Sequence, residues 1–253
     1  MCLLVFGYDA HSEYSLVFAG NRDEFYDRPT APAGLWPEAP HVLGGRDRKA
    51  GGTWVGVTRA GYWGVVTNVR EPGRYREDAR SRGRLVDTYL REEPSPRTYL
   101  EQVAVEADTY NGFNLLLGTP TDLYYYSNRT TGIQTVAPGI HGLSNEQLDT
   151  PWPKVTRAKQ RYQACLQQRD LSAEALLRLL NDRRPAPNAA LPDTGLSRER
   201  ERMLSSLFID GERYGTRAST VLRIARDGTV AFTERTFEDG APLETRRFSF
   251  DAG

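Results

Sequence analysis

The stretch MCLLVFGYDAHSEYSLVFAGNRDEF at residues 1–25 decides how the chain begins to fold. Residues 2–8 form one continuous apolar run and residues 14–19 form another, with a short polar segment between them. Two apolar runs joined by a polar turn predict a β-hairpin whose strands are buried on both faces. We therefore expect the chain to enter the core at its start, with the strand that begins at Cys2 in the middle of a sheet.

The rest of the chain alternates between strand and helix patterns. Residues 22–52 are rich in proline and glycine and predict a loop, whereas residues 53–58 and 62–68 predict a second hairpin. Apolar spacing predicts the later elements, which are helices over residues 85–90, 99–104, 153–168 and 176–180 and near Ser197, and strands over residues 113–117, 123–126, 217–224, 229–235 and 243–250. Strands at both ends with helices between them predict an α+β fold of two helix-covered sheets. We expect a single domain over residues 1–253.

The composition limits the classes of partner. The chain has 253 residues, of which 39% are hydrophobic and 26% charged, and its 33 basic side chains balance its 33 acidic ones. Without net charge or a basic stripe, nothing attracts it to nucleic acid or an anionic membrane. Its apolar start is too short for a signal sequence or a membrane span, so we expect a cytoplasmic protein without a transmembrane segment. Two cysteines and three scattered histidines predict neither a disulfide framework nor a metal centre.

Cys2 is the first candidate for chemistry. If Met1 were removed, Cys2 would be N-terminal, and its α-amine, with a pKa of roughly 7.7 to 8.0, could take the thiol proton. The alternative is a small buried residue without a role. The hairpin would bring the NRDE sequence at residues 21–24 next to Cys2, where a carboxylate could hold an ammonium and an arginine could favour the thiolate. Equally, these charges could satisfy one another in a loop.

Several short motifs together resemble one known family. They are NRDE at residues 21–24, GGRD at 44–47, GGTWVG at 51–56, NVR at 68–70, GLSN at 142–145, PWPK at 151–154 and YGTR at 214–217. From Cys2 to about Phe237, the chain resembles the NRDE, or Transport and Golgi organisation protein 2, family. Each motif alone is weak, but jointly they are specific.

This family is in turn similar in layout to N-terminal-nucleophile hydrolases of the choloylglycine hydrolase and penicillin V acylase type. That similarity implies a four-layer αββα sandwich with a site built around a terminal cysteine. The site residues that it implies are the nucleophile Cys2, the amine-binding Asp23, the oxyanion donors Asn68 and Asn145, the late arginine Arg217 and the early arginine Arg22. There is one departure, since the early arginine of those hydrolases precedes the asparagine of the motif, whereas Arg22 follows Asn21.

Two further residues are candidates for contact with a ligand. Trp152 lies near Asn145 in sequence and could wall the site, although packing would explain it equally. His141 stands beside Gly142 and could line the pocket, although a histidine in a loop is more often solvated. Asn68 could also be a turn residue that bonds its own backbone.

Three functions remain open at this point. The first is a hydrolase that cleaves a small non-peptide amide through an acyl group on Cys2. The second is a non-catalytic carrier of haem or of an acyl-CoA or lipid, since proteins of the resembled family are implicated in haem trafficking and lipid metabolism. The absence of a CxxCH motif excludes the usual covalent attachment of haem, so haem would be a transported ligand rather than a cofactor. The third is a scaffold with a vestigial site.

Overall fold

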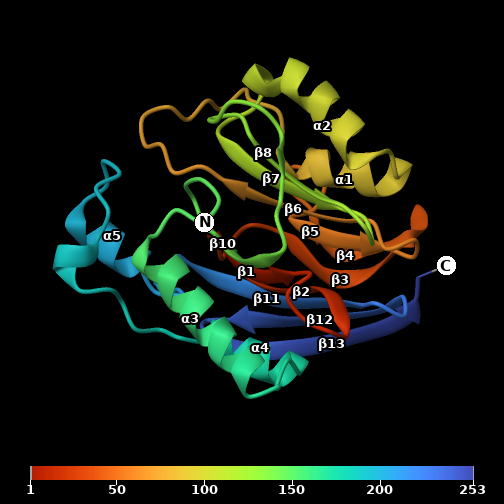
Figure 1. Ribbon diagram of the computed structural model, residues 1–253. Coiled ribbons are helices and arrows are strands. Elements are labelled where there is room, and N and C mark those ends of the chain that lie inside the picture. The colour runs from red at the N-terminus through yellow and green to blue at the C-terminus, as the bar shows by residue number, and fades with distance from the viewer. Residues whose placement is uncertain (1, 253) are drawn as a thin grey trace.

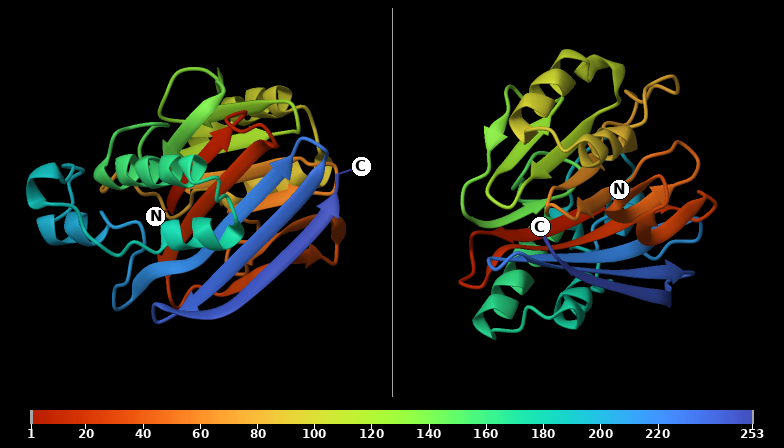
Figure 2. Two further views of the ribbon diagram at one scale, coloured as in Figure 1. Left: turned by 60° about the horizontal axis from the view of Figure 1, so that its bottom comes forward. Right: turned by 90° about the vertical axis from the view of Figure 1, so that its right-hand side faces the viewer.

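Two β-sheets stack face to face in the computed structural model, which describes residues 2–252, and helices cover both outer faces (Figures 1 and 2). The six-stranded sheet has the order β10 (Gly139–Leu143), β1 (Cys2–Tyr8), β2 (Tyr14–Phe25), β11 (Tyr214–Ala225), β12 (Thr229–Glu238) and β13 (Ala241–Asp251). The seven-stranded sheet has the order β3 (Thr30–Trp36), β4 (Ala39–Asp47), β5 (Val55–Thr58), β6 (Trp63–Asn68), β7 (Phe113–Gly118), β8 (Leu123–Ser127) and β9 (Gln134–Thr135). This arrangement confirms the αββα sandwich.

The helices divide between the two outer layers. Those on the seven-stranded sheet are α1 (Gly83–Glu92) and α2 (Pro96–Val105), and those on the six-stranded sheet are α3 (Pro153–Gln167) and α4 (Ala173–Leu180). The shorter helices are α5 (Arg198–Met203) and the 3₁₀ turns η1 (Ala107–Thr109) and η2 (Asn188–Ala190). Within residues 2–252, no helix is both long enough and apolar enough to cross a membrane.

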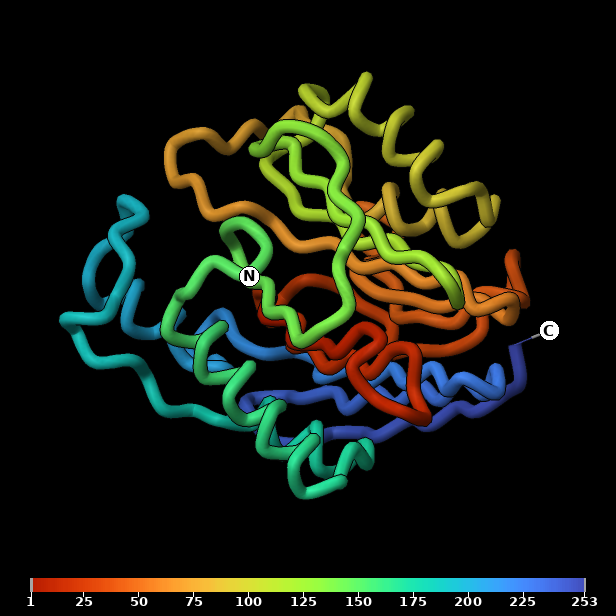
Figure 3. The backbone as a smooth tube through the Cα atoms, in the orientation of Figure 1, coloured from red at the N-terminus to blue at the C-terminus, as the bar shows by residue number. Residues whose placement is uncertain are grey.

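The predicted first hairpin is present, and β1 lies inside its sheet. β1 pairs antiparallel with β2 on one side and with β10 on the other. Leu4 and Phe6 face the core between the sheets, whereas Leu3 and Val5 face α3 and α4. Figure 3 shows the N-terminal end of the trace in the middle of the molecule, beside the chain that follows β10. An apolar run with two buried faces thus became an internal strand, as expected.

The prediction of a loop over residues 22–52 was wrong. β2 continues to Phe25, and β3 and β4 form one edge of the seven-stranded sheet. Pro32 misled the prediction, yet it lies on the edge strand where the β3–β4 register shifts between Ala31 and Gly34, and a missing N–H costs little there. The short strands β9 and β10 were not predicted, because segments of two and five residues carry little periodic signal.

Three apolar layers hold the sandwich together. The central layer lies between the sheets and contains Phe18 and Trp63, whose ring centroids are 6.1 Å apart. A second layer packs Leu85 and Tyr89 of α1 onto the seven-stranded sheet, and a third packs α3 and α4 onto the six-stranded sheet. Burial of apolar surface on both sides of the six-stranded sheet explains why consecutive residues of β1 are apolar.

Candidate active site

The first hairpin itself assembles one wall of the site. Cys2 lies directly opposite Arg22 in the β1–β2 register. β2 is longer than β1 and pairs on its other side with β11, so that Asp23 lies opposite Thr216. The NRDE sequence is therefore strand rather than loop, and its side chains are fixed relative to Cys2 by backbone hydrogen bonds.

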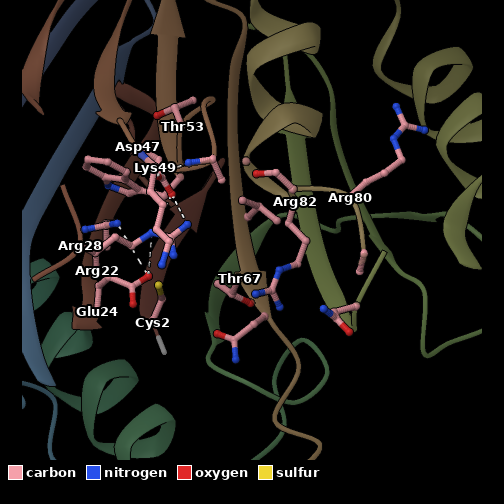
Figure 4. A pocket seen from close by; sticks show the side chains of 18 of the residues that line it. Cys2, Arg22, Glu24, Arg28, Asp47, Lys49, Thr53, Thr67, Arg80 and Arg82 are labelled. Carbon is pink, nitrogen blue, oxygen red and sulfur yellow. Dashed lines mark hydrogen bonds and ion pairs between the residues drawn. The ribbon is translucent and has the colours of Figure 1, made fainter. Parts of the chain in front are cut away.

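Cys2 opens onto a cavity of about 510 Å³, within the size range of small-molecule sites. Its walls come from β2, from residues 47–54, from the end of β6 and from residues 75–83 before and at the start of α1. Figure 4 shows Arg22, Glu24 and Arg28 on one side of Cys2 and Thr67 and Arg82 on the other. Most of these side chains are polar or charged, so the cavity is suited to a polar ligand.

The Cys2 thiol is not ionised by its surroundings alone. Burial raises the pKa of Cys2 above its ordinary value, and the Asp23 carboxylate adds to this, while Arg22 acts in the opposite direction. The residue is half-buried, so a ligand in the cavity can still reach it. A raised pKa keeps the thiol protonated near neutral pH, and nucleophilic chemistry here therefore requires a base.

Asp23 lies in a closed polar environment beneath Cys2. It is 2% exposed, and its Oδ1 accepts a hydrogen bond from the Thr216 hydroxyl at 2.7 Å. Burial raises the pKa of Asp23, and the Lys154 ammonium is the strongest of the groups that lower it. The positive charge of Lys154 favours the ionised form of the Asp23 carboxylate, and an ionised carboxylate can hold an ammonium group.

Lys154 is a buried charged residue that sequence reasoning assigned no role. It is 1% exposed, and its Nζ donates to the carbonyl of Leu204 at 3.1 Å. Burial lowers the pKa of Lys154 to about 8, against the opposing effect of Asp23. The signal was its place in the PWPK motif, in a chain with only three lysines, but only the packing of α3 on the six-stranded sheet shows that the side chain points inward.

Asn68 and Asn145 are joined in a way that orients one of them. The Asn145 Nδ2 donates both to the Asn68 carbonyl at 2.9 Å and to the Asn68 Oδ1 at 3.0 Å. Asn145 is fully buried, and the Ser144 hydroxyl donates to its Oδ1 at 3.2 Å. Asn68 lines the cavity, whereas Asn145 lies behind it. Because Asn145 holds the Asn68 Oδ1, the Asn68 Nδ2 can donate a hydrogen bond to a ligand in the cavity.

Arg217 lies next to the site without lining the cavity. Its Nη1 donates to the carbonyls of Phe25, Tyr26 and Arg28, at 2.8, 3.0 and 3.2 Å. These carbonyls belong to the turn by which the chain leaves β2 for β3. Arg217 therefore holds the segment that carries Arg28 into the cavity wall, and any influence on Cys2 is indirect.

The two predicted ligand contacts lie outside the described lining of the cavity. The His141 Nδ1 pairs with the Asp149 carboxylate at 2.7 Å, and its Nε2 lies 2.9 Å from the Ala137 carbonyl. Trp152 stacks under the Arg70 guanidinium, whose carbon lies 4.6 Å from the ring centroid. His141 therefore fastens β10 to the following turn, and Trp152 supports the region behind Asn145. In this structure neither faces Cys2.

Arg82 is a cavity residue that the sequence did not identify. It occupies the N-cap position of α1, and its Nη1 donates to the Gly112 carbonyl at 3.0 Å. Burial lowers the pKa of Arg82, whereas a thiolate at Cys2 would raise it. Among many arginines in this sequence, nothing local distinguishes Arg82, because its position depends on how α1 packs against β6.

Two solved structures share the fold of this chain. The chain superposes on an N-acylethanolamine-hydrolyzing acid amidase orthologue from Caenorhabditis elegans with a TM-score of 0.50, at 11% identity and over 87% of this chain and 92% of that one. It superposes on a mutant conjugated bile acid hydrolase from Clostridium perfringens with a TM-score of 0.51, at 9% identity and over 99% and 92% of the two chains. The fold is thus that of the N-terminal-nucleophile hydrolases.

Sequence comparison then places the chain within a family. Residues 1–239 match the family model described as Transport and Golgi organisation 2, and the chain belongs to that family. It is 34% identical to the Transport and Golgi organization 2 homolog of Mus musculus over 277 residues and 35% identical to that of Homo sapiens over 274 residues. Each alignment covers 99% of both chains. The family expected from the motifs is therefore confirmed.

Proposed function

We propose that this protein is an amidohydrolase in which Cys2 attacks a small non-peptide amide. The observation that carries the proposal is the position of Cys2 at the head of an internal strand, facing a cavity into which Asn68 can donate. The two superposed structures are named as an acid amidase and a bile acid hydrolase, and their fold supports the proposal by analogy alone, because function depends on the site.

The proposed reaction begins once Met1 has been removed. The free α-amine of Cys2 takes the thiol proton, and the sulfur attacks the amide carbonyl carbon to form a C–S bond. Asn68 Nδ2 donates to the oxygen as it becomes negative, and Asn145 keeps Asn68 in that orientation. The α-ammonium returns its proton to the amide nitrogen as the C–N bond breaks. Water, deprotonated by the α-amine, then hydrolyses the thioester.

Asp23 and Arg22 have supporting roles in this proposal. Asp23 holds the α-ammonium that forms when the thiol proton is transferred, and Thr216 fixes its carboxylate. Arg22 lies opposite Cys2 and favours the thiolate, which offsets part of the rise in its pKa caused by burial. Arg217 acts on the site only through the β2–β3 turn.

The test is acylation of Cys2 by an electrophilic amide or a β-lactam, measured by intact-protein mass. We expect one acyl group per chain on protein that lacks Met1, and none on the Cys2→Ala variant. A Cys165→Ala variant is the matched control, because it removes the other thiol and leaves the cavity intact. Equal acylation of protein that retains Met1 would contradict the role of the α-amine.

A second candidate is the carriage of haem or of an acyl-CoA or lipid in the same cavity, whose volume suits a small-molecule ligand. Of the side chains that could bind haem iron, Cys2 and Tyr75 line the cavity, whereas both His141 nitrogens are engaged elsewhere. A saturable Soret shift at one site per chain that is weakened by Cys2→Ala, without any acylation, would favour carriage over hydrolysis.

A further inference from the structure

The basic side chains around Cys2 are not equally neutralised. The cations that line the cavity are Arg22, Arg28, Lys49, Arg80 and Arg82. Arg28 forms a 2.6 Å ion pair with Asp47, and Arg80 is hydrogen-bonded to Glu106. The exposed Lys49 ammonium needs no partner other than water. Arg22 has only a long ion pair with Glu24, at 3.9 Å, and no carboxylate is paired with Arg82 in the described part of the chain, so these two cations are the least neutralised.

Arg22 is a buried cation that has no hydrogen-bonded acceptor among the described residues. Its side chain is 6% exposed and packs over Trp54, with the guanidinium carbon 4.4 Å from the ring centroid. Within residues 2–252, its Nη1 has no hydrogen-bond partner, and the nearest carboxylate oxygen, on Glu24, lies 3.9 Å from Nη2. A buried guanidinium whose ion pair is long and whose Nη1 is unsatisfied is costly, and a negative group in the cavity would offset that cost.

Arg82 faces the same space from the start of α1. Its only hydrogen-bond acceptor in the described part of the chain is the Gly112 carbonyl, which uses one of its five donors. Ser81 and Gly83 also line the cavity, so the positive end of the α1 dipole points toward it. The first turn of α1 contains no acidic residue that would neutralise that end.

The two guanidiniums flank Cys2 from opposite walls. Figure 4 shows Arg22 on the β2 side of Cys2 and Arg82 on the α1 side, with the sulfur between them. We propose that the cavity binds a ligand with an anionic group, a carboxylate or a phosphate, which lies between Arg22 and Arg82 at the start of α1. For the amidase, the substrate class is then an anionic amide, and in that respect the inference rests on the proposed function.

The test compares two alkylating reagents that differ in charge. Iodoacetate and iodoacetamide both transfer a substituted methyl group to a thiolate with loss of iodide, but only iodoacetate is an anion. The ratio of their rates at Cys2 is measured by peptide mass spectrometry in native protein and in the same protein unfolded in urea. We expect the native ratio to favour iodoacetate by roughly tenfold more than the unfolded ratio, because the cavity concentrates anions.

Substitutions at Arg82, with a control at Arg84, make the test specific. Arg82→Gln should remove most of the preference for iodoacetate, and Arg82→Lys should restore part of it. Arg84→Gln is the matched control, because Arg84 carries the same charge on the same helix but is 57% exposed and lies outside the described lining of the cavity. Inorganic phosphate and propionate, added separately, should each be tested for saturable protection of Cys2, which distinguishes a phosphate ligand from a carboxylate ligand.

The failure of this inference can be separated from the failure of the proposed function. The anion site would be overturned if Cys2 reacted without any preference for iodoacetate, or if Arg82→Gln left that preference unchanged. Neither result would contradict the role of Cys2 as nucleophile. If Cys2 reacted with neither reagent, the nucleophile would fail, and calorimetric titration with phosphate and propionate would decide the anion site. Binding weakened by Arg82→Gln but not by Arg84→Gln would support it, and no saturable binding of either anion would overturn it.

Discussion

At the scale of single residues, the paired asparagines provide the sharpest test of mechanism. Asn68→Ala should slow acylation of Cys2 about a hundredfold, the usual cost of losing one oxyanion donor. Asn145→Ala should also slow it, because the Asn68 amide would no longer be held through its Oδ1. Since Asn145 acts through Asn68, the double variant should be no slower than Asn68→Ala alone.

The measurement is the acylation rate of each variant, with melting temperatures to show that the fold is intact. Independent, additive losses in the double variant would mean that Asn145 contacts the reacting group directly. An Asn68→Ala variant as fast as the parent protein would remove Asn68 from the mechanism.

At the scale of elements, Glu234 on β12 connects the two sheets. It is 1% exposed, and its Oε1 accepts a hydrogen bond at 2.6 Å from the backbone N–H of Ala33 on β3. Burial raises the pKa of Glu234 from 4.5 to about 7. Between these values the folded protein binds more protons than the unfolded chain, so the free energy of unfolding falls as the pH rises through this range.

Glu234→Gln keeps the acceptor for Ala33 and removes the ionisation. The parent protein should therefore lose about 3 kcal/mol of stability relative to this variant between pH 4.5 and pH 8, at 1.36 kcal/mol per pKa unit. Urea unfolding of both proteins at several pH values measures the difference. A difference that stays constant across this range would show that Glu234 does not titrate as described.

The elements also show what the sequence could predict and why the rest escaped it. The first hairpin was predictable because both faces of β1 are buried, which leaves a continuous apolar run in the sequence. β3 and β4 were missed because their prolines and glycines resemble a loop, and only the assembled sheet shows that β3 lies at its edge, where Pro32 is tolerated. Cys2 was predicted from its position at the head of an apolar run, and Asp23 and Asn68 came from motifs, whereas Arg82 and Lys154 depend on helix packing, which no local pattern records.

At the scale of the whole molecule, stability depends on the apolar layer between the sheets. Phe18 is 1% exposed and packs in that layer against Trp63 of the opposite sheet. Phe18→Ala should lower the free energy of unfolding by about 3–5 kcal/mol, because it leaves a cavity where the two sheets meet. Phe25→Ala is the matched control on the same strand, since Phe25 is 54% exposed. Denaturant unfolding compares the two, and similar losses would contradict this description of the core.

The pairing of β2 with β11 has a consequence for the order in which the site is made. Arg22 and Asp23 lie next to Cys2 through a hairpin that is complete within the first 25 residues, but Asp23 lies opposite Thr216, almost 200 positions later. During synthesis the chain emerges from its N-terminus, so the nucleophile leaves the ribosome long before the strand that completes its surroundings. On the proposed function, Cys2 is therefore the first part of the site to be translated and among the last to be activated, and a nascent chain that stops before β11 should carry Cys2 as an ordinary thiol.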